Sequence, residues 1–514
     1  MFKIFLIYLL DIPAALTVIL KMVSRKRIIT TLIVLRKKGF SLSKTFIHPY
    51  MPNSAPATRQ AMLDALGIQE VEELYSQSIP EALRYRGTMD IPKPIVSEYA
   101  LQQHVNSIIN RNNTCEEYDS YLGAGCYNHY VPAICDEINT RAEFLTGYCG
   151  DTYSDHGKMQ AIFEYTSMLG ELLDMDMVSY TLYDGGQAVN SALRMTIRIQ
   201  AAAGHPERTE LLVPATMNPE ILSQLKDYCK SVASIVPVAC NPKSGRMDLA
   251  DLKEKLEMGT AASVFVENPS YLGFWEEQIR QIAQLTHAHG ALLVVQPDVA
   301  SLGVIEPPAH YGADIVCGDI QPLGMHMQYG GGCAGFIATA YEERFIQEYP
   351  TYLYGICRTQ KEGEYGWGRA LNYRCSHGSR ENAREYFGTE TGLWSITAAV
   401  YLALMGPEGM KELGAYILQM CNYAVKTLSR VPGIEVNKLG GANFQEFVVG
   451  FDGTGKTVAQ INDALLSHHI FGGKDLSKDF PFLGQSALFC VTEKTTCEQL
   501  QKLADALAAI VKEA

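Results

Sequence analysis

A regular alternation of short apolar runs and amphipathic runs over residues 159–298 constrains the fold of this chain more than any other feature. Runs such as ELLVPA and ALLVVQPD predict buried strands, and the runs between them have helical spacing. Strand and helix in alternation indicate βα crossovers and a mostly parallel sheet covered on both faces, so we predict an α/β protein. The expected strands cover residues 179–184, 210–215, 234–240, 262–269 and 291–298, and the expected helices cover residues 160–175, 185–203, 218–232, 248–258 and 276–290.

The order of elements differs on either side of this core. Before it, short amphipathic pieces alternate with prolines, which suggests an arm of the kind that covers a dimer partner, with Ser54 or Thr58 as the cap of its first helix. After it, long helices over residues 391–433 lead into a mixed segment of strands and helices. We predict four segments: an extension (1–47), an N-terminal arm (48–118), a large domain (119–405) and a small C-terminal α+β domain (406–514).

Charge and cysteine content narrow the class of protein. The net charge is −13, although residues 1–47 hold nine Lys and Arg against the single acid Asp11, so the remaining chain is more negative still. Such a body is not expected to bind nucleic acid. The 13 cysteines are scattered without a CxxC pair, which favours reduced thiols in a cytoplasmic protein.

Residues 1–47 allow three interpretations. A membrane anchor is one, but the apolar run is about 17 residues against the ~20 required, and Asp11 and Pro13 interrupt it. A secretory leader is the second, although no small-residue cleavage site precedes the basic run. The third is that translation starts later. Nothing downstream requires a membrane, so membrane attachment is not expected.

Asp298 ends the run ALLVVQPD, and the sequence after it has the character of a pyridoxal-phosphate (PLP) site that lacks one part. A PLP enzyme needs a carboxylate on the pyridinium nitrogen and a lysine that holds the cofactor as a Schiff base. Asp298 is the candidate carboxylate. The lysine is expected a few tens of residues later, before a glycine-rich turn, yet no lysine occurs between Leu256 and Gln360.

Two glycine turns are candidates for contact with a phosphate. Asp184, Gly185 and Gly186 stand between an expected strand and an expected helix, where free amides at the positive helix end could receive a phosphate. A simple tight turn is the alternative. Gly330 and Gly331 permit close approach of the backbone, either to a phosphate of a partner or to a neighbouring strand.

The loop Ser120–Pro132 supplies the candidate catalytic residues, Tyr127 and His129. Its glycines and tyrosines either pack as a tight turn or present hydroxyl and imidazole groups to a ligand, and an imidazole moves protons near neutral pH. Other histidines, in the run HAHG and at His468 and His469, stand at expected helix ends without a cluster of further metal ligands. No metal site is expected.

Five long strings occur in order along the chain: HPYMPNS, YLGAGCYNHYVP, MQAIFEYTSMLGELLDMDMVSYTLYDGGQA, GADIVCGDIQPLGMHMQYGGGCAGF and GGKDLSKDFPFLGQSALFCVTEK. On these strings the chain resembles the alpha subunit (subunit 1) of glycine dehydrogenase (decarboxylating), the P-protein of the glycine cleavage system. The resemblance runs from about His48 to the C-terminus. The first 47 residues lie outside it, which favours the interpretation that translation starts later.

The resemblance implies a PLP-dependent transferase of fold type I (aspartate aminotransferase-like) and a partnership in an even-numbered assembly such as a heterotetramer. In it the beta subunit (subunit 2) carries the Schiff-base lysine and binds PLP covalently, whereas the alpha subunit is a degenerate copy, inactive alone. Leu323 stands about where the lysine would be. The implied reaction decarboxylates glycine on PLP and transfers the aminomethyl group to the lipoyl arm of the H-protein. The cofactor-binding candidates of this chain are then vestigial or face the partner.

Two segments depart from the family pattern. Residues 147–157 read GYCGDTYSDHG where alpha subunits have a segment like TPYQPEISQG, and residues 384–395 read REYFGTETGLWS in place of a stretch like REKATSNICTNQ. Both are expected near the active-site region. Two alternatives therefore stand beside glycine cleavage: a partner subunit of a PLP complex that acts on another amino acid, and a non-catalytic scaffold protein.

Overall fold

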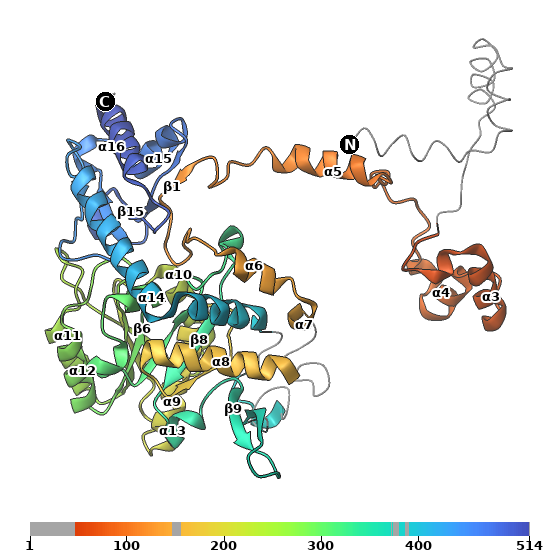
Figure 1. Cartoon of the computed structure of the whole chain (residues 1–514), viewed down its shortest axis with the longest axis horizontal. Helices are drawn as coiled ribbons and strands as arrows, with labels where there is room; N and C mark the ends of the chain where they lie inside the picture. Colours follow the sequence, from red (N-terminus) through yellow and green to blue (C-terminus); the bar gives the residue numbers. More distant parts are fainter. Residues whose placement is uncertain (1–46, 146–155, 372, 374–379, 386–389, 513–514) are drawn as a thin grey trace. The chain divides into compact units, whose positions relative to one another are not determined.

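The structure is a computed structural model that describes residues 47–145, 156–371, 373, 380–385 and 390–512 (Figure 1). The chain divides into two compact units, residues 1–106 and residues 107–514. Within the described ranges, no helix is long and apolar enough to span a membrane. The expected extension lies outside the described residues except for Ile47, and so do residues 147–155 of the first diverged segment and residues 386–389 of the second.

The described part of the first unit is a series of short helices. They are η1 (Pro52–Ser54), α3 (Pro56–Leu66), α4 (Glu72–Ser78), η2 (Glu81–Leu83) and the beginning of α5 (Glu98–Ile109). The expected cap of α3 is wrong: Ala55 precedes the helix without a side-chain bond, and Pro56 begins it, because proline suits the first helical turn. The Ser54 hydroxyl instead accepts a hydrogen bond of 2.7 Å from the His48 amide, and Thr58 lies inside the helix.

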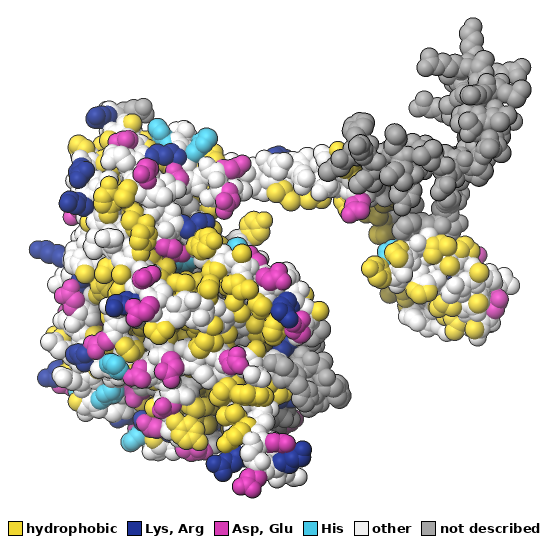
Figure 2. Space-filling view, in the orientation of Figure 1, with side chains coloured by type: hydrophobic (Ala, Val, Ile, Leu, Met, Phe, Trp, Pro, Cys, Tyr) yellow, Lys and Arg dark blue, Asp and Glu magenta, His cyan; other side chains and the backbone are white. Residues whose placement is uncertain are grey.

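This first unit has almost no hydrophobic core. Among described residues 47–106, Leu63 is the single buried residue. Figure 2 shows apolar side chains spread over the surface of α3 and α4. The large apolar side chains exposed in this stretch include Tyr50, Met62, Leu66, Tyr75, Leu83, Tyr85, Met89, Ile91, Val96 and Tyr99. So much exposed apolar surface is typical of a segment that another surface covers.

The second unit is built on a seven-stranded sheet with the order β2-β8-β7-β6-β5-β3-β4. The pairs β4–β3, β3–β5, β5–β6 and β6–β7 are parallel, whereas β8 is antiparallel to both β7 and β2. The strands are β2 (Met177–Val178), β3 (Glu210–Pro214), β4 (Ser234–Val238), β5 (Ala261–Glu267), β6 (Leu292–Gln296), β7 (Ile315–Asp319) and β8 (Gly335–Thr339). The predicted α/β class and mostly parallel sheet are confirmed.

Helices cover both faces of this sheet, as the alternation of side chains along each strand requires. On β6, Leu292 and Val294 pack into the cluster that includes α9 and α10, whereas Leu293 and Val295 pack into the cluster that includes α11 and α12. A third cluster joins α8 to α14. The bounds of these helices are α8 (His156–Leu173), α9 (Gly185–Ala202), α10 (Pro219–Cys229), α11 (Leu249–Glu257), α12 (Ile279–Ala288) and α14 (Gly392–Leu428).

A second sheet follows near the C-terminus. Its four antiparallel strands have the order β11-β12-β15-β14 and share an apolar cluster with α15, α16 and the end of α14. Their bounds are β11 (Glu435–Val436), β12 (Glu446–Gly450), β14 (Lys474–Asp475), β15 (Ser486–Cys490), α15 (Val458–Leu466) and α16 (Cys497–Lys512). Within α14, Gly406 is non-helical and Pro407 follows, at the predicted boundary between the large and small domains; that boundary stays a prediction.

The remaining elements are short helices and strands, and the strands among them form two separate two-stranded sheets. They are β1 (Asp119–Ser120), α6 (Ala133–Asn139), α7 (Ala142–Leu145), η3 (Val299–Gly303), η4 (Pro308–Tyr311), η5 (Gln328–Gly330), α13 (Glu343–Ile346), β9 (Leu353–Arg358), β10 (Tyr365–Ala370), η7 (Arg380–Asn382), η8 (Asp452–Thr454), β13 (Ile470–Phe471) and η9 (Pro481–Leu483). The strand expected at residues 179–184 is wrong, because this stretch has only an isolated bridge from Leu182 to Gly335 beyond the two residues of β2.

Candidate functional site

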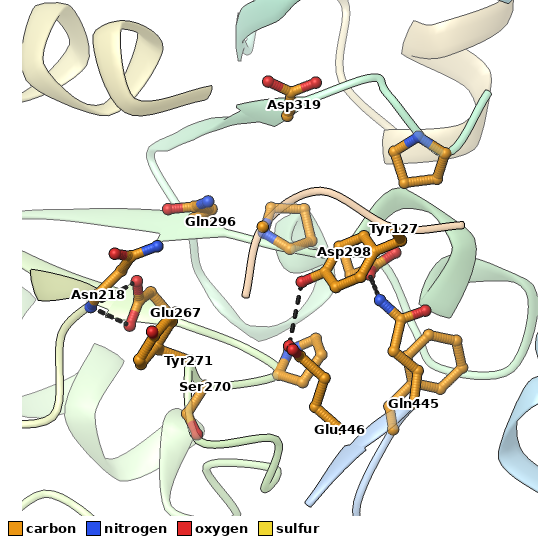
Figure 3. A pocket seen from close by; sticks show the side chains of 15 residues that line it. Tyr127, Asn218, Glu267, Ser270, Tyr271, Gln296, Asp298, Asp319, Gln445 and Glu446 are labelled. Atoms are coloured by element: carbon orange, nitrogen blue, oxygen red, sulfur yellow. Dashed lines mark hydrogen bonds between the residues drawn. The ribbon is translucent and has the colours of Figure 1, made fainter. Parts of the chain in front are cut away.

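A cavity of about 80 Å³ lies at the carboxyl edge of the seven-stranded sheet (Figure 3). The ends of β5, β6 and β7 contribute to its wall, because parallel strands bring their carboxyl ends to one edge, where α/β proteins place ligands. The loop before α6 and the beginning of β12 complete it. The lining residues are Gly125, Tyr127, Asn218, Glu267, Pro269, Ser270, Tyr271, Gln296, Pro297, Asp298, Asp319, Pro322, Phe444, Gln445 and Glu446.

Asp298, the carboxylate predicted from the sequence, lines this cavity and also begins η3. Its Oδ1 accepts a hydrogen bond from the Ala300 amide (2.8 Å), and its Oδ2 accepts one from Nε2 of Gln445 (2.9 Å). Withdrawal from water raises the pKa of Asp298, and the nearby His129 partly offsets this effect. Both oxygens are therefore held by the protein itself.

Tyr127 lines the same cavity and binds a second carboxylate. Its hydroxyl donates to Oε2 of Glu446 (3.1 Å), while Oε1 of Glu446 accepts from the Ala124 amide. Burial raises the pKa of Glu446 to about 7, against the lowering effect of these two donors. Tyr127 itself has a pKa well above its usual value, because it is buried beside Glu446. Its phenol therefore stays protonated and donates.

Two further carboxylates end the strands on either side of β6. Glu267, at the end of β5, accepts from the Asn218 amide (3.1 Å), and burial raises its pKa to about 8. Asp319, at the end of β7, has a pKa raised by burial to about 7. In Figure 3, Glu267 lies to the left of the cavity, Asp298 and Gln445 to the right and Asp319 above. Four carboxyl groups thus face one small space.

At the beginning of α9, the predicted phosphate-binding turn, carboxylate side chains of the chain itself accept hydrogen bonds from the free helix amides. Oδ2 of Asp319 accepts from the Gly185 amide (2.7 Å), and Oδ1 of Asp184 accepts from the Gln187 amide (2.7 Å). A Cβ atom on Gly185 would lie 2.9 Å from the Cβ of Asp319, and one on Gly186 would lie 2.5 Å from Oε1 of Gln224. The positive end of the helix therefore meets a protein anion where a phosphate was expected.

The residues of the cavity and of the predicted phosphate-binding turn do not fit PLP. Within the lining set there is no lysine, arginine or histidine. Leu323 is fully buried in the apolar cluster between α8 and α14 and is not a lining residue. A phosphate dianion would face four carboxyl groups, and two of the helix amides that could bind it are already bonded to Asp319 and Asp184. The cavity is also small beside ligand pockets of roughly 300–1,000 Å³.

His129 does not line the cavity. Its Nδ1 is 2.8 Å from Oε2 of Glu493, and its ring is buried. Burial opposes the charged ring, yet the contact with Glu493 raises the pKa of His129 above its usual value. Tyr127 and His129 are neighbours, with ring centroids 5.9 Å apart, but Tyr127 alone reaches the cavity. Their predicted catalytic role stays a prediction.

Gly330 and Gly331 lie in an exposed turn that does not line the cavity. Gly330 has a φ of 92°, and Tyr329 beside it also has a left-handed backbone (φ 58°) with a fully exposed ring. A Cβ on Gly332 would lie 1.9 Å from the His326 carbonyl oxygen, so the close approach occurs within the turn itself. Contact of this turn with a partner stays a prediction.

Sequence reasoning missed most of the cavity. Glu267 and Asp319 end the runs ASVFVE and IVCGD, the same signal that identified Asp298, and could have been found by it. Glu446 and Gln445 come from a distant strand and carry no local signal. Among the described residues, no three His, Cys, Asp or Glu side chains are grouped to hold a metal ion.

The sequence matches the family model of the glycine cleavage system P-protein over residues 48–507. The probable glycine dehydrogenase (decarboxylating) subunit 1 of Pyrococcus furiosus is 37% identical over 464 residues, which cover 90% of this chain and 99% of the relative. The corresponding protein of Carboxydothermus hydrogenoformans is 36% identical over 460 residues, which cover 89% of this chain and 99% of that protein.

Solved structures agree with these relatives. A crystal structure of glycine decarboxylase (P-protein) of the glycine cleavage system, in inhibitor-bound form, has a TM-score of 0.79 and 28% identity, covering 90% of this chain and 100% of that chain. The sphingosine-1-phosphate lyase of Burkholderia pseudomallei has a TM-score of 0.58 at 15% identity, covering 85% of this chain and 95% of that one, and shows the fold alone. The predicted fold type I architecture is confirmed.

Proposed function

The chain belongs to the glycine cleavage system P-protein family, and we propose that it is the alpha subunit (subunit 1) of a glycine dehydrogenase (decarboxylating) whose PLP is held by a second subunit. The reaction of such a complex decarboxylates glycine and passes the aminomethyl group to the lipoyl H-protein. PLP supplies the electron sink for this chemistry when bound to the partner.

The observation that carries this proposal is the absence of a lysine that could hold PLP, combined with carboxylates that already bind the amides of the predicted phosphate-binding turn. No lysine occurs between Leu256 and Gln360, and Leu323 is buried at the predicted lysine position. Asp319 bonds to the Gly185 amide at the beginning of α9. A chain that keeps the fold but lacks both anchors of the cofactor is suited to complete an assembly rather than to act alone.

The exposed apolar surface of the first unit supports the proposal that the chain binds a partner subunit. Apolar side chains such as Tyr85, Met89, Ile91 and Val96 are more than half exposed and have no core to enter within residues 47–106. We propose that this arm packs on the beta subunit, with the assembly located in the cytoplasm. Burial of these side chains would favour association by roughly 25 cal/mol per Å² of apolar surface.

The test is glycine–bicarbonate exchange with purified components. The chain, a lysine-bearing subunit 2, PLP and lipoyl H-protein are assayed together and with each component left out. We expect exchange from the full set and none from this chain alone. Full-rate exchange without this chain would contradict its role in the complex.

A substrate series separates glycine cleavage from the alternatives. If an intact complex exchanged bicarbonate with the carboxyl group of another amino acid but not of glycine, a diverged PLP complex would replace the proposal. Removal of residues 48–96 provides a second control, because the arm is expected to contribute to association. The truncated chain should keep its thermal stability yet bind subunit 2 more weakly in analytical ultracentrifugation.

A further inference from the structure

The cavity at the sheet edge contains buried polar atoms without partners, and these atoms distinguish it from ordinary packing. They are the Tyr271 hydroxyl, Oε1 of Gln296, Oε1 of Gln445 and Oγ of Ser270, all on side chains that line the cavity. Tyr271 is 94% buried and Gln445 is 99% buried. A buried polar group left without a hydrogen bond is unfavourable, so four in one space indicate a missing group.

The missing group has to be a donor. The two glutamine oxygens are amide carbonyls, which only accept hydrogen bonds. Nε2 of Gln445 is already directed to Asp298, which fixes the orientation of that amide and leaves its oxygen free. The carboxylates around the cavity also accept rather than donate when they are ionised.

The missing group also has to be positive. Four carboxyl groups line the cavity, at Glu267, Asp298, Asp319 and Glu446, and no basic side chain lines it. The ammonium group of Lys474 lies 5.9 Å from the centroid of the Tyr271 ring, but it is paired with Glu220 at 2.7 Å and does not line the cavity. Burial raises the pKa of Glu267 to about 8 and those of Asp319 and Glu446 to about 7. Protons bound to these carboxyl groups therefore neutralise part of their negative charge, and a bound cation would displace the protons.

We propose that this cavity binds a small primary ammonium ion, such as ammonium or methylammonium, held by Asp298, Glu446 and the free oxygens of Gln296 and Gln445. The volume of about 80 Å³ corresponds to two or three water molecules, which leaves room for a ligand of one or two heavy atoms. The hydroxyl oxygen of Tyr271, which has no partner, is a further acceptor for this ion. The site rests on this chain alone and does not depend on the proposed function.

Other ligand classes suit the cavity less well. A metal ion needs several close ligands, and no such group of three occurs among the described residues. An amino acid would bring a fifth carboxylate into a space already lined by four. A quaternary ammonium ion lacks the N–H donors that the glutamine oxygens require.

The test is calorimetric titration of the full-length chain with methylammonium chloride at pH 8, with tetramethylammonium chloride and potassium chloride at equal ionic strength as controls. We expect saturable binding of methylammonium with release of protons, and no saturable binding of either control ion. Absence of methylammonium binding to the folded chain, or equal binding of potassium or tetramethylammonium, would overturn the proposal.

Matched variants locate the site. Asp298→Asn keeps the shape of the side chain but removes one charge, and should weaken methylammonium binding about tenfold or more. Asp314→Asn is its control, because Asp314 lies at the opposite edge of the sheet, where its carboxylate accepts from the Leu293 amide. Equal affinities in these two variants would exclude the proposed cavity.

A second pair removes single hydroxyl groups and keeps the test decisive if Asp298→Asn does not fold. Tyr271→Phe should weaken binding several-fold, whereas Tyr165→Phe should not change it. The Tyr165 hydroxyl is likewise buried without a partner, but it belongs to the cluster between α8 and α14 and does not line the cavity. Unchanged binding in Tyr271→Phe would contradict the inference.

Discussion

Two groups of buried carboxylates lie at the same sheet edge and differ in what surrounds them. At the beginning of α9, the oxygens of Asp319 accept three backbone amides, from Gly185, Gln321 and Ala334. Asp298 and Glu446 line the same cavity as Asp319, but they share it with amide and hydroxyl oxygens that have no partner. The difference indicates that a carboxylate bonded to the amides of a helix end takes the place of a ligand, whereas carboxylates that share a space with free oxygens mark a place for one.

The largest effect is expected where a lysine is restored. Leu323→Lys places an ammonium group in a fully buried apolar cluster and should lower the free energy of unfolding by about 3–5 kcal/mol. Leu323→Met, which conserves volume, should cost less than about 1.5 kcal/mol. Urea unfolding measures both. A stable Leu323→Lys variant that binds PLP would contradict this account. The hydrogen bond of Asp319 to the Gly185 amide would then not exclude the cofactor.

A smaller loss is expected when the carboxylate that closes the turn is neutralised. Asp319→Asn replaces one accepting oxygen by an NH₂ group that faces backbone amides, and should destabilise the chain by about 3 kcal/mol. Asp184→Asn is the control, since asparagine caps helices as well as aspartate does. Equal unfolding midpoints for the two variants would show that Asp319 is not the structural substitute for a ligand.

The tight contact between the turn and β7 gives a third prediction. In Gly185→Ala the new Cβ would lie 2.9 Å from the Cβ of Asp319 and 3.1 Å from its backbone nitrogen, which should cost about 2 kcal/mol. Gly331→Ala is the control, because its Cβ would meet the Gln328 carbonyl at an ordinary 3.5 Å. Thermal melts of both variants test the difference, and a Gly185→Ala variant as stable as the parent would contradict the closed turn.

The smallest effect, when expressed per pH unit, is a pH dependence of the stability. Glu267, Asp319 and Glu446 have folded-state pKa values of about 8, 7 and 7, above their usual values, so the folded chain binds more protons than the unfolded chain. The contribution of these groups to stability therefore falls as pH rises from about 4 to 8.

Glu446→Gln should flatten this slope by up to about 1.4 kcal/mol per pH unit, and the exposed Glu306→Gln should leave it unchanged. The groups near Glu446 include Asp298, Tyr127 and Lys474, and both variants retain all three. Urea unfolding from pH 5 to 9 measures the slopes, and equal slopes in the two variants would assign the pH dependence to other groups.

The sequence predicted the parts of the fold that depend on local patterns. The helix expected at residues 185–203 is α9, and the strand before Asp298 is β6, because periodicity and a polar terminal residue are properties of neighbouring positions. The hydrogen bond from the Gly185 amide to Asp319 could not be predicted, since the two residues are 134 positions apart in the sequence. The cavity likewise needs Glu446 beside Asp298, which no local pattern indicates.

The expectation of a phosphate at the Asp184–Gly186 turn shows the limit of motif reasoning. A glycine pair at the beginning of a helix indicates available amides but does not show which anion binds them. Here Asp319 supplies that anion. Leu323 shows the opposite case: the absence of a lysine is visible in the sequence itself, and the structure adds that the leucine is packed into the core.

The central claim is that PLP belongs to the partner and not to this chain. Its most direct measurement is borohydride reduction of the PLP-loaded complex with subunit 2, followed by peptide mass spectrometry to locate the pyridoxyl-lysine. The structure predicts stoichiometric label on one lysine of subunit 2 and none on this chain. Stoichiometric label on a lysine of this chain would contradict the account.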